Sequence, residues 1–327
     1  MSDSPVDVVI SWVDGNDPVH ADKLAAYLKE AGISRPESAA PTKFNECGEL
    51  TYCVRSLLHF APWIRTIYIV TDSQIPPIVT ALAGTPAEHK VRLIDERTLF
   101  GGFEAYLPTF NCISIESLLW RIPGLSERFI YLNDDWFLIR PVAYDDFFRG
   151  DRLVLQGDWK VQSVKKWGAL WKQWVSRWMK TAYTPVQIDL YREIQENSAR
   201  LLGWDTHFFH LPHSPLPARK STFVNFFTRH PEVLHHNVSH RCRDRQQYLP
   251  LSLSHHLEIK EHQAIIDRRL RAAYVNGACH SFRKIQVRLR HAERDERVAF
   301  VCMQSMDLAP ESVRQMMLAW LKHKIAS

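Results

Sequence analysis

The sequence of 327 residues has no long apolar run and no cysteine pair with metal-ligand spacing. No stretch approaches the roughly 18 consecutive apolar residues of a membrane-spanning helix. The first residues lack the basic segment that precedes the apolar part of a secretory signal, so we expect a soluble, cytoplasmic protein. The six cysteines form no Cys-x-x-Cys pair, which argues against a structural zinc site and a redox motif.

The charge pattern gives little support to nucleic-acid binding. The formal net charge is +5, the lysines and arginines are not gathered into one run, and no nucleic-acid module is recognisable. This mild excess of positive charge suits anionic ligands. The hydrophobic content of 46% is enough to bury a sizeable core, and we find no internal repeat.

Short β-branched runs alternate with helical patterns along much of the chain. Strands are predicted at residues 6–12, 66–70, 91–94 and 129–132. Helices are predicted at residues 49–60, 113–120 and 310–325. This alternation predicts an α/β fold with a parallel sheet, in which ligands bind beyond the carboxyl ends of the strands. The prolines at positions 212, 215 and 217 favour irregular loops there.

Composition changes along the chain predict three parts. Residues 1–150 form the sheet-containing half, residues 151–203 a helical insertion rich in Trp and Lys, and residues 204–327 the C-terminal part.

The strongest local signal is the Asp134-Asp135 pair, directly after the predicted strand 129–132. Two adjacent carboxylates at the tip of a buried strand are costly unless a cation or hydrogen-bond donors compensate them. Mg²⁺ or Mn²⁺, bound together with substrate phosphates, would provide that compensation. The structural alternative is that one aspartate caps the following turn.

Polar residues also follow the first two predicted strands. Asp14, Asn16 and Asp17 follow the first, and Thr71 and Asp72 follow the second. These side chains are suited to a ribose, a base edge or a metal, but equally to turn formation.

The later part of the chain supplies candidate bases and cations. His213 is a candidate general base toward a sugar hydroxyl, with a structural role as the alternative. Arg241 and Arg243 are natural partners for a diphosphate.

A tryptophan stripe marks the predicted insertion. Its members recur at intervals of four, three and four residues, which places them on one helical face: Trp167, Trp171, Trp174 and Trp178. Such a stripe fits a packed core, an anionic membrane surface or a stacked sugar acceptor.

Several separated segments resemble the Stealth family, which includes bacterial capsule hexose-1-phosphate transferases and the α/β subunits of GlcNAc-1-phosphotransferase. They are DVVISWVDGNDP (7–18), residues 49–76, residues 108–138, HLPHSPLPARK with the later HRCRD, and AFVCMQSMD (299–307). In the last segment, Gln304-Ser305 stands where family members usually have Asn-Asp, and Asp307 is a candidate substitute.

The resemblance implies a Rossmann-like, GT-A-like fold, a UDP-sugar or similar donor, a divalent cation and release of a nucleoside monophosphate. It makes residues 1–150 the nucleotide-sugar-binding half, and residues 204–327 would complete the catalytic domain. By this likeness, Trp12, Asp14 and Asp17 lie at the donor nucleotide, and Asp134 and Asp135 at the metal and diphosphate. Three further residues would lie in or beside the catalytic pocket: Glu49, Arg55 and Glu116. His213 and Arg241 would face the transferred phosphate.

We therefore expect a hexose-1-phosphate transferase that modifies a carbohydrate or glycolipid acceptor in capsule or surface polysaccharide synthesis. Peripheral contact with the inner face of the membrane is expected through the tryptophan stripe. Two alternatives stay open at this point: a metal-dependent glycosyltransferase that releases a nucleoside diphosphate, and an inactive relative that binds glycans or membranes.

Overall fold

The computed structural model describes residues 4–163 and 189–325. Its main sheet has the strand order β10-β4-β1-β2-β3. Four of these strands are parallel: β1 (Val6–Ser11), β2 (Thr66–Thr71), β3 (Val91–Asp95) and β4 (Arg128–Asn133). The edge strand β10 (Leu216–Arg219) runs antiparallel to β4. The predicted α/β class with a parallel sheet is confirmed.

Three smaller sheets adjoin the main one. The first contains β12 (Arg271–Asn276), β13 (Val298–Gln304) and β5 (Trp136–Leu138). The second contains β11 (Ala264–Ile266), β7 (Arg152–Leu155) and β6 (Phe148–Arg149). The third pairs β8 (Asp158–Val161) with β9 (His207–His210). Because only a two-residue turn joins β4 to β5, the main sheet and the β13 sheet are directly linked beside the carboxyl end of β4.

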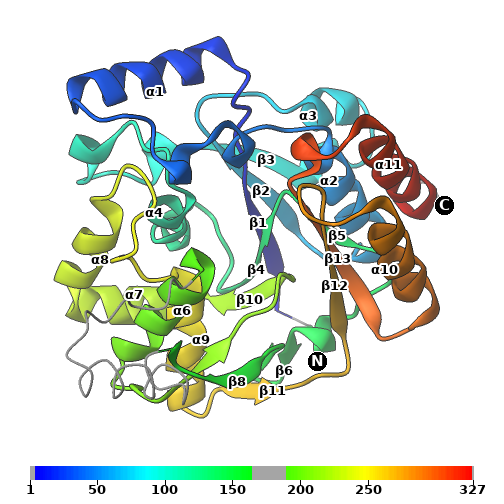
Figure 1. Cartoon of the computed structure of the whole chain (residues 1–327). Coiled ribbons are helices and arrows are strands. Elements are labelled where there is room, and N and C mark those ends of the chain that lie inside the picture. The colour runs from blue at the N-terminus through cyan, green and yellow to red at the C-terminus, as the bar shows by residue number, and fades with distance from the viewer. Residues whose placement is uncertain (1–3, 164–188, 326–327) are drawn as a thin grey trace, which may run out of the picture.

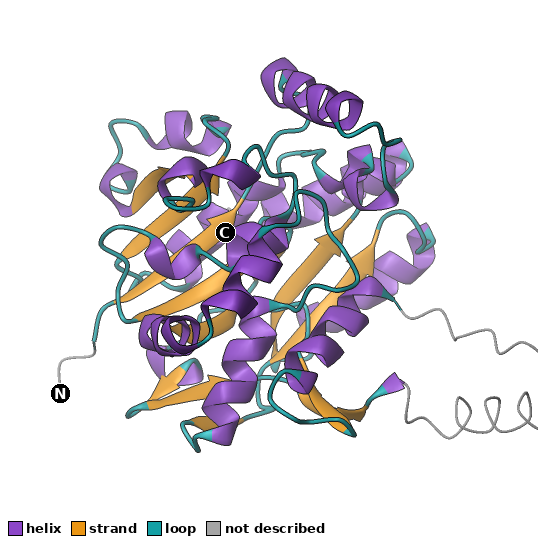
Figure 2. Ribbon diagram, turned by 90° about the vertical axis from the view of Figure 1, so that its left-hand side faces the viewer, coloured by secondary structure: helices purple, strands orange, loops and turns teal. Residues whose placement is uncertain are grey.

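Helices cover both sides of the central strands (Figures 1 and 2). In Figure 1, one side carries α2 (Glu49–Phe60), α3 (Pro77–Leu82), α10 (Phe282–Arg294) and α11 (Glu311–Ile325). The other side carries α4 (Cys112–Glu116), α6 (Leu190–Arg200), α7 (Lys220–Arg229), α8 (Pro231–Val238) and α9 (Pro250–Lys260). Helix α1 (Pro18–Glu30) lies above the carboxyl end of β1. None of the described helices is long and apolar enough to cross a bilayer.

Burial explains why β1 and β4 form the centre of the sheet. Val8, Val9 and Ile10 of β1 are fully buried, as expected for a parallel strand covered on both faces. The chain runs from β1 to β2 and β3 on one side, then returns to place β4 on the other side of β1. The strand order therefore reverses between β1 and β4, which is where a ligand crevice is expected in an open α/β sheet.

Two predicted elements differ from the structure. The helix expected at 113–120 ends at Glu116, where the Ser117 hydroxyl donates to the Ile113 carbonyl, and a separate turn (Leu119–Arg121) follows. The loop expected around Pro217 instead contains strand β10. Proline is tolerated there because β10 is an edge strand. The tryptophan stripe predicted at residues 167–178 lies outside the described residues.

Two buried histidines of α9 form hydrogen bonds to the backbone of strands β10 and β9. His255 Nε2 donates to the Pro217 carbonyl of β10 at 2.8 Å. His256 Nδ1 donates to the Ser252 carbonyl at 2.6 Å, and its Nε2 accepts the Phe209 N–H at 2.9 Å. Burial lowers the pKa of each imidazole to about 4, so both rings are neutral at pH 7. These contacts assign a structural role to both histidines.

We expect His255 to destabilise the fold in acid. Its folded pKa lies below the unfolded value, so protonation favours unfolding, and stability is lost as the pH falls from about 6.5 toward 4. Wild type should lose about 2 kcal/mol more unfolding free energy than His255→Gln between pH 7 and pH 5. Urea unfolding at both pH values measures this, with exposed His89→Gln as control. Identical losses in wild type and His255→Gln would contradict it.

Candidate functional site

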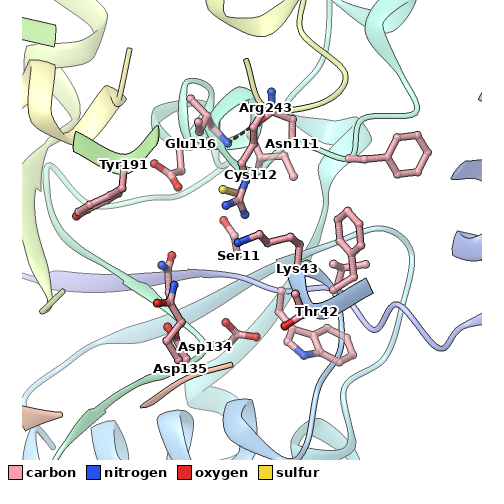
Figure 3. A pocket seen from close by; sticks show the side chains of 18 of the residues that line it. Ser11, Thr42, Lys43, Asn111, Cys112, Glu116, Asp134, Asp135, Tyr191 and Arg243 are labelled. Atoms are coloured by element: carbon pink, nitrogen blue, oxygen red, sulfur yellow. Dashed lines mark hydrogen bonds between the residues drawn. The ribbon is translucent and has the colours of Figure 1, made fainter. Parts of the chain in front are cut away.

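A cavity of about 670 Å³ opens at the carboxyl ends of β1 and β4, at the point where the strand order reverses. Its walls come from the ends of these strands, from residues 42–45, from α4, from the start of α6 and from the end of β13. Figure 3 shows the side chains that point into it. The cavity gathers both acidic and basic groups, which are described in turn below.

Asp134 and Asp135 line the cavity in the turn between β4 and β5. Burial, followed by the nearby charges of Asp135 and Glu49, raises the pKa of Asp134 well above its usual range. Burial also raises the pKa of Asp135, although the hydrogen bond from Cys302 opposes this shift. The Cys302 thiol donates to Asp135 Oδ2 at 3.6 Å, while Oδ1 has no partner among the described residues.

These carboxylates fit a divalent cation. Their mutual repulsion and the unpartnered Oδ1 are features that a bound positive charge would relieve. Within the described ranges, no group of three or more His, Cys, Asp or Glu side chains is arranged to hold a metal ion. Two carboxylates completed by substrate phosphates would be enough for Mg²⁺.

Two glutamates also line the cavity. Glu49 is the first residue of α2, and burial raises its pKa to about 7 even though the Cys47 N–H donates to it. Glu116, at the end of α4, accepts a hydrogen bond of 3.0 Å from the Tyr131 hydroxyl. Burial raises the pKa of Glu116 to about 7 as well, and its Oε2 has no partner in the described part of the chain.

Arg243 and Lys43 supply positive charge on the opposite side of the cavity from the aspartates (Figure 3). Burial and the nearby charge of Arg243 lower the pKa of Lys43, so the two cations lie close together. Arg243 Nε has no hydrogen-bond partner among the residues described. A pair of cations with unused donors is suited to a phosphate or diphosphate. No sequence pattern indicated Lys43, which is the last residue of a short turn, Pro41–Lys43.

Two predicted catalytic residues lie outside the cavity lining. The Arg241 guanidinium donates to the Ala105 carbonyl at 2.8 Å and lies over the Tyr27 ring at 5.3 Å. Arg55 is exposed on α2, because it follows Val54 on a helix whose other face is buried. Arg243 therefore lines the cavity, whereas Arg241 and Arg55 do not.

His213 lies between two tyrosine rings. Its imidazole stacks on Tyr191 with ring centroids 4.6 Å apart and on Tyr274 at 5.2 Å. Burial lowers the pKa of His213, although the charge of Asp189 opposes the shift. The ring is therefore neutral near pH 7 and able to accept a proton in the cavity that it lines.

Residues 299–307, which depart from the family pattern at Gln304-Ser305, form hydrogen bonds to other residues of the cavity wall. Gln304 lines the cavity and accepts a hydrogen bond from the Tyr274 hydroxyl, whose ring stacks on His213. Asp307 accepts from Thr42 Oγ1 at 2.8 Å and from Asn45 Nδ2 at 3.0 Å. Asp307 thus fixes the loop that carries Lys43.

The predicted nucleotide-binding residues divide into two groups. Trp12, Glu49 and Asp72 line the cavity, whereas Thr71 is buried at the end of β2 without lining it. The turn residues Asp14, Asn16 and Asp17 also do not line it. Asp14 Oδ1 accepts the Asn16 N–H at 2.8 Å, and Asp17 Oδ1 accepts the Val19 N–H at 2.8 Å and caps α1. These contacts match the structural alternative of turn formation.

Comparison with known proteins identifies the family. Stealth protein CR1, conserved region 1, matches residues 4–32, and Stealth protein CR2, conserved region 2, matches residues 43–155. An exopolysaccharide phosphotransferase of Lactiplantibacillus plantarum is 32% identical over 73% of this chain and 71% of its own length. The chain belongs to the Stealth family.

In two other relatives the match spans less than two thirds of the relative's own length. An exopolysaccharide phosphotransferase of Streptomyces coelicolor is 47% identical over 44% of this chain, but the match spans only 25% of that relative's length. A capsular polysaccharide phosphotransferase of Haemophilus influenzae is 32% identical over 74% of this chain and 61% of its own length. Among solved structures, the galactosyltransferase LgtC is 13% identical over 91% of this chain and 86% of its own, with a TM-score of 0.42.

The Stealth regions cover only part of the cavity. Conserved region 2 includes Lys43, Glu116 and the Asp134-Asp135 pair. His213 and Arg243 lie beyond residue 155, outside both matched regions, and reach the same cavity through the fold.

Proposed function

We propose that this Stealth protein transfers a hexose-1-phosphate, such as GlcNAc-1-phosphate, from a nucleotide sugar to a carbohydrate hydroxyl. The donor would be a UDP-sugar, the leaving group a nucleoside monophosphate, and the product part of a capsular or surface polysaccharide. One observation carries the proposal: Asp134 and Asp135 face Arg243 and Lys43 across a cavity at the strand-order reversal. Such an arrangement suits a cation-bound diphosphate.

The chemistry follows from these positions. Asp134 and Asp135 would hold Mg²⁺ or Mn²⁺, which would neutralise negative charge on the diphosphate. Arg243 and Lys43 would bind the phosphate oxygens whose charge is redistributed during transfer. The acceptor oxygen would form a bond to the sugar-bearing phosphorus, and the bond from that phosphorus to the nucleoside monophosphate would break. His213 would take the hydroxyl proton.

The acceptor and the cellular location extend the proposal. A carbohydrate or glycolipid acceptor fits the polysaccharide context of the named relatives. The cytoplasmic location and the peripheral contact with the inner face of the membrane stay predictions from the sequence.

Removal of divalent cations should abolish turnover. Dialysis against EDTA is expected to lower the rate by at least about 100-fold, because phosphoryl-transfer sites rely on metal-assisted charge neutralisation. Adding Mg²⁺ or Mn²⁺ back should restore the rate, while circular dichroism stays unchanged throughout. Full turnover in the presence of EDTA would contradict the metal assignment.

The nucleotide released during turnover tests the function itself. Purified protein is incubated with a panel of nucleotide sugars, Mg²⁺ or Mn²⁺ and candidate acceptors, and the nucleotide products are identified by mass spectrometry. A nucleoside monophosphate supports sugar-phosphate transfer. A nucleoside diphosphate would place the protein among the glycosyltransferases, and glycan binding without turnover would indicate an inactive relative.

A further inference from the structure

Two buried polar atoms in one part of the cavity, Trp12 Nε1 and His20 Nε2, have no hydrogen-bond partner among the described residues. The buried carboxyl group of Glu96 lines the same cavity, close enough to Asp72 for that charge to raise its pKa. The three residues are 6%, 3% and 3% exposed, and all line the cavity. Buried donors and acceptors without partners are costly, and a ligand that hydrogen-bonds to them would remove that cost.

Asp72 orients His20 for such a ligand. Asp72 Oδ2 lies 3.2 Å from His20 Nδ1, and Asp72 Oδ1 lies 2.5 Å from Lys23 Nζ. Burial raises the pKa of Asp72, but these two hydrogen bonds outweigh it and the net shift is downward, so the carboxylate is ionised. His20 Nδ1 faces this carboxylate, and Nε2 is left available for a ligand. Both oxygens of Asp72 are occupied, whereas Nε2 of His20 is not.

The strand order separates this cluster from the Asp134-Asp135 pair. Asp72 follows β2, and Glu96 follows β3, whereas Asp134 follows β4. Because neighbouring strands lie about 4.8 Å apart, the ends of β3 and β4 are about 14 Å apart across the sheet. An extended nucleotide whose diphosphate lies at the aspartate pair would place its ribose and base toward β2 and β3.

Glu96 offers both a donor and an acceptor. Burial, followed by the charge of Asp72, raises the pKa of the Glu96 carboxyl to about 8, so it is mainly protonated at pH 7. A neutral carboxyl group can donate through its O–H and accept through its carbonyl. Phe44 and Phe110 pack against His20, each with ring centroids 5.4 Å from the imidazole, and add apolar surface to this wall of the cavity.

We propose that Trp12, His20 and Glu96 form the site for the donor nucleoside, with the Glu96 carboxyl hydrogen-bonding to its ribose or base. This inference rests on the proposed function, since it takes a nucleotide sugar as the donor. Within this site, Glu96 and His20 recognise the nucleoside, and Asp72 acts as a positioning residue through His20. The site is distinct from the groups that contact the diphosphate.

Binding of nucleotides without turnover tests the inference. Isothermal titration calorimetry on the full chain compares inorganic pyrophosphate with the nucleoside diphosphate that wild type binds most tightly among UDP, CDP, ADP and GDP. Glu96→Ala is expected to weaken nucleoside diphosphate binding at least tenfold and to change pyrophosphate binding less than twofold. Glu96→Gln keeps a donor and an acceptor, so it should retain affinity within about threefold of wild type. The exposed Glu30→Ala is the matched control.

The outcomes are distinct. Unchanged nucleotide affinity in Glu96→Ala overturns the inference, as does an equal loss for nucleotide and pyrophosphate, which would indicate a general structural defect. A 2′-deoxy analogue distinguishes the two contacts: a penalty that disappears in Glu96→Ala assigns Glu96 to the ribose, and a penalty that persists assigns it to the base. If binding behaves as expected but turnover releases a nucleoside diphosphate, the proposed transferase function fails while this site stands.

Discussion

Replacing Asp135 by alanine is expected to lower turnover by about 1,000-fold or more, equivalent to about 4 kcal/mol of transition-state stabilisation. Asp135 lines the cavity beside Asp134 and has an unpartnered Oδ1, so we expect it to contribute charge to a ligand more than contacts to the fold. The fold should not suffer, because the change removes one of two adjacent buried carboxylates whose charges oppose each other.

Steady-state kinetics with saturating donor and acceptor measures the rate, and thermal unfolding measures the fold. Asp145→Ala serves as control, since Asp145 is exposed and does not line the cavity. Near-normal turnover of Asp135→Ala would contradict the proposed role of Asp135 at the metal and diphosphate. A large drop in melting temperature would instead assign Asp135 to the fold.

The second large effect is expected at Arg243. Alanine at this position should lower turnover by about 100-fold to 1,000-fold, because it removes a cation whose Nε donor is unpartnered in the described structure. Arg243→Lys should restore little of this rate, since lysine lacks the planar set of donors that binds phosphate in a bidentate manner.

Arg241 provides a control only two residues away. Its guanidinium lies over Tyr27 and donates to the Ala105 carbonyl outside the cavity lining. Arg241→Ala should therefore change turnover by less than about threefold, as is usual for residues away from the reacting groups. Equal losses in the two variants, measured on the same nucleotide donor, would contradict the assignment of the phosphate contact to Arg243.

The four parallel strands and the Asp134-Asp135 pair could be predicted, because both are marked by the order of residues within short stretches of sequence. The buried runs that became β1, β2, β3 and β4 are marked by β-branched residues and by the polar turns that follow them. The Asp134-Asp135 pair follows one of these runs directly, so its position at a strand end needed no knowledge of tertiary contacts.

The rest of the site depends on long-range contacts that no local pattern reveals. Lys43 reaches the cavity on a loop that Asp307 holds from 265 residues away along the chain. His20 has the spacing of an ordinary buried residue of α1, and only its contact with Asp72 distinguishes it. The choice between Arg241 and Arg243 likewise depends on which side chain faces Glu116, which spacing alone does not decide.

The fate of the sugar-bearing phosphorus tests the central claim most directly. A nucleotide sugar carrying ³²P only in that phosphate is incubated with the protein, Mg²⁺ and acceptor, and the label is followed by chromatography. We predict that the label moves into the acceptor as a phosphodiester, that unlabelled nucleoside monophosphate is released, and that Asp135→Ala abolishes both. Label retained in a released nucleoside diphosphate would contradict sugar-phosphate transfer.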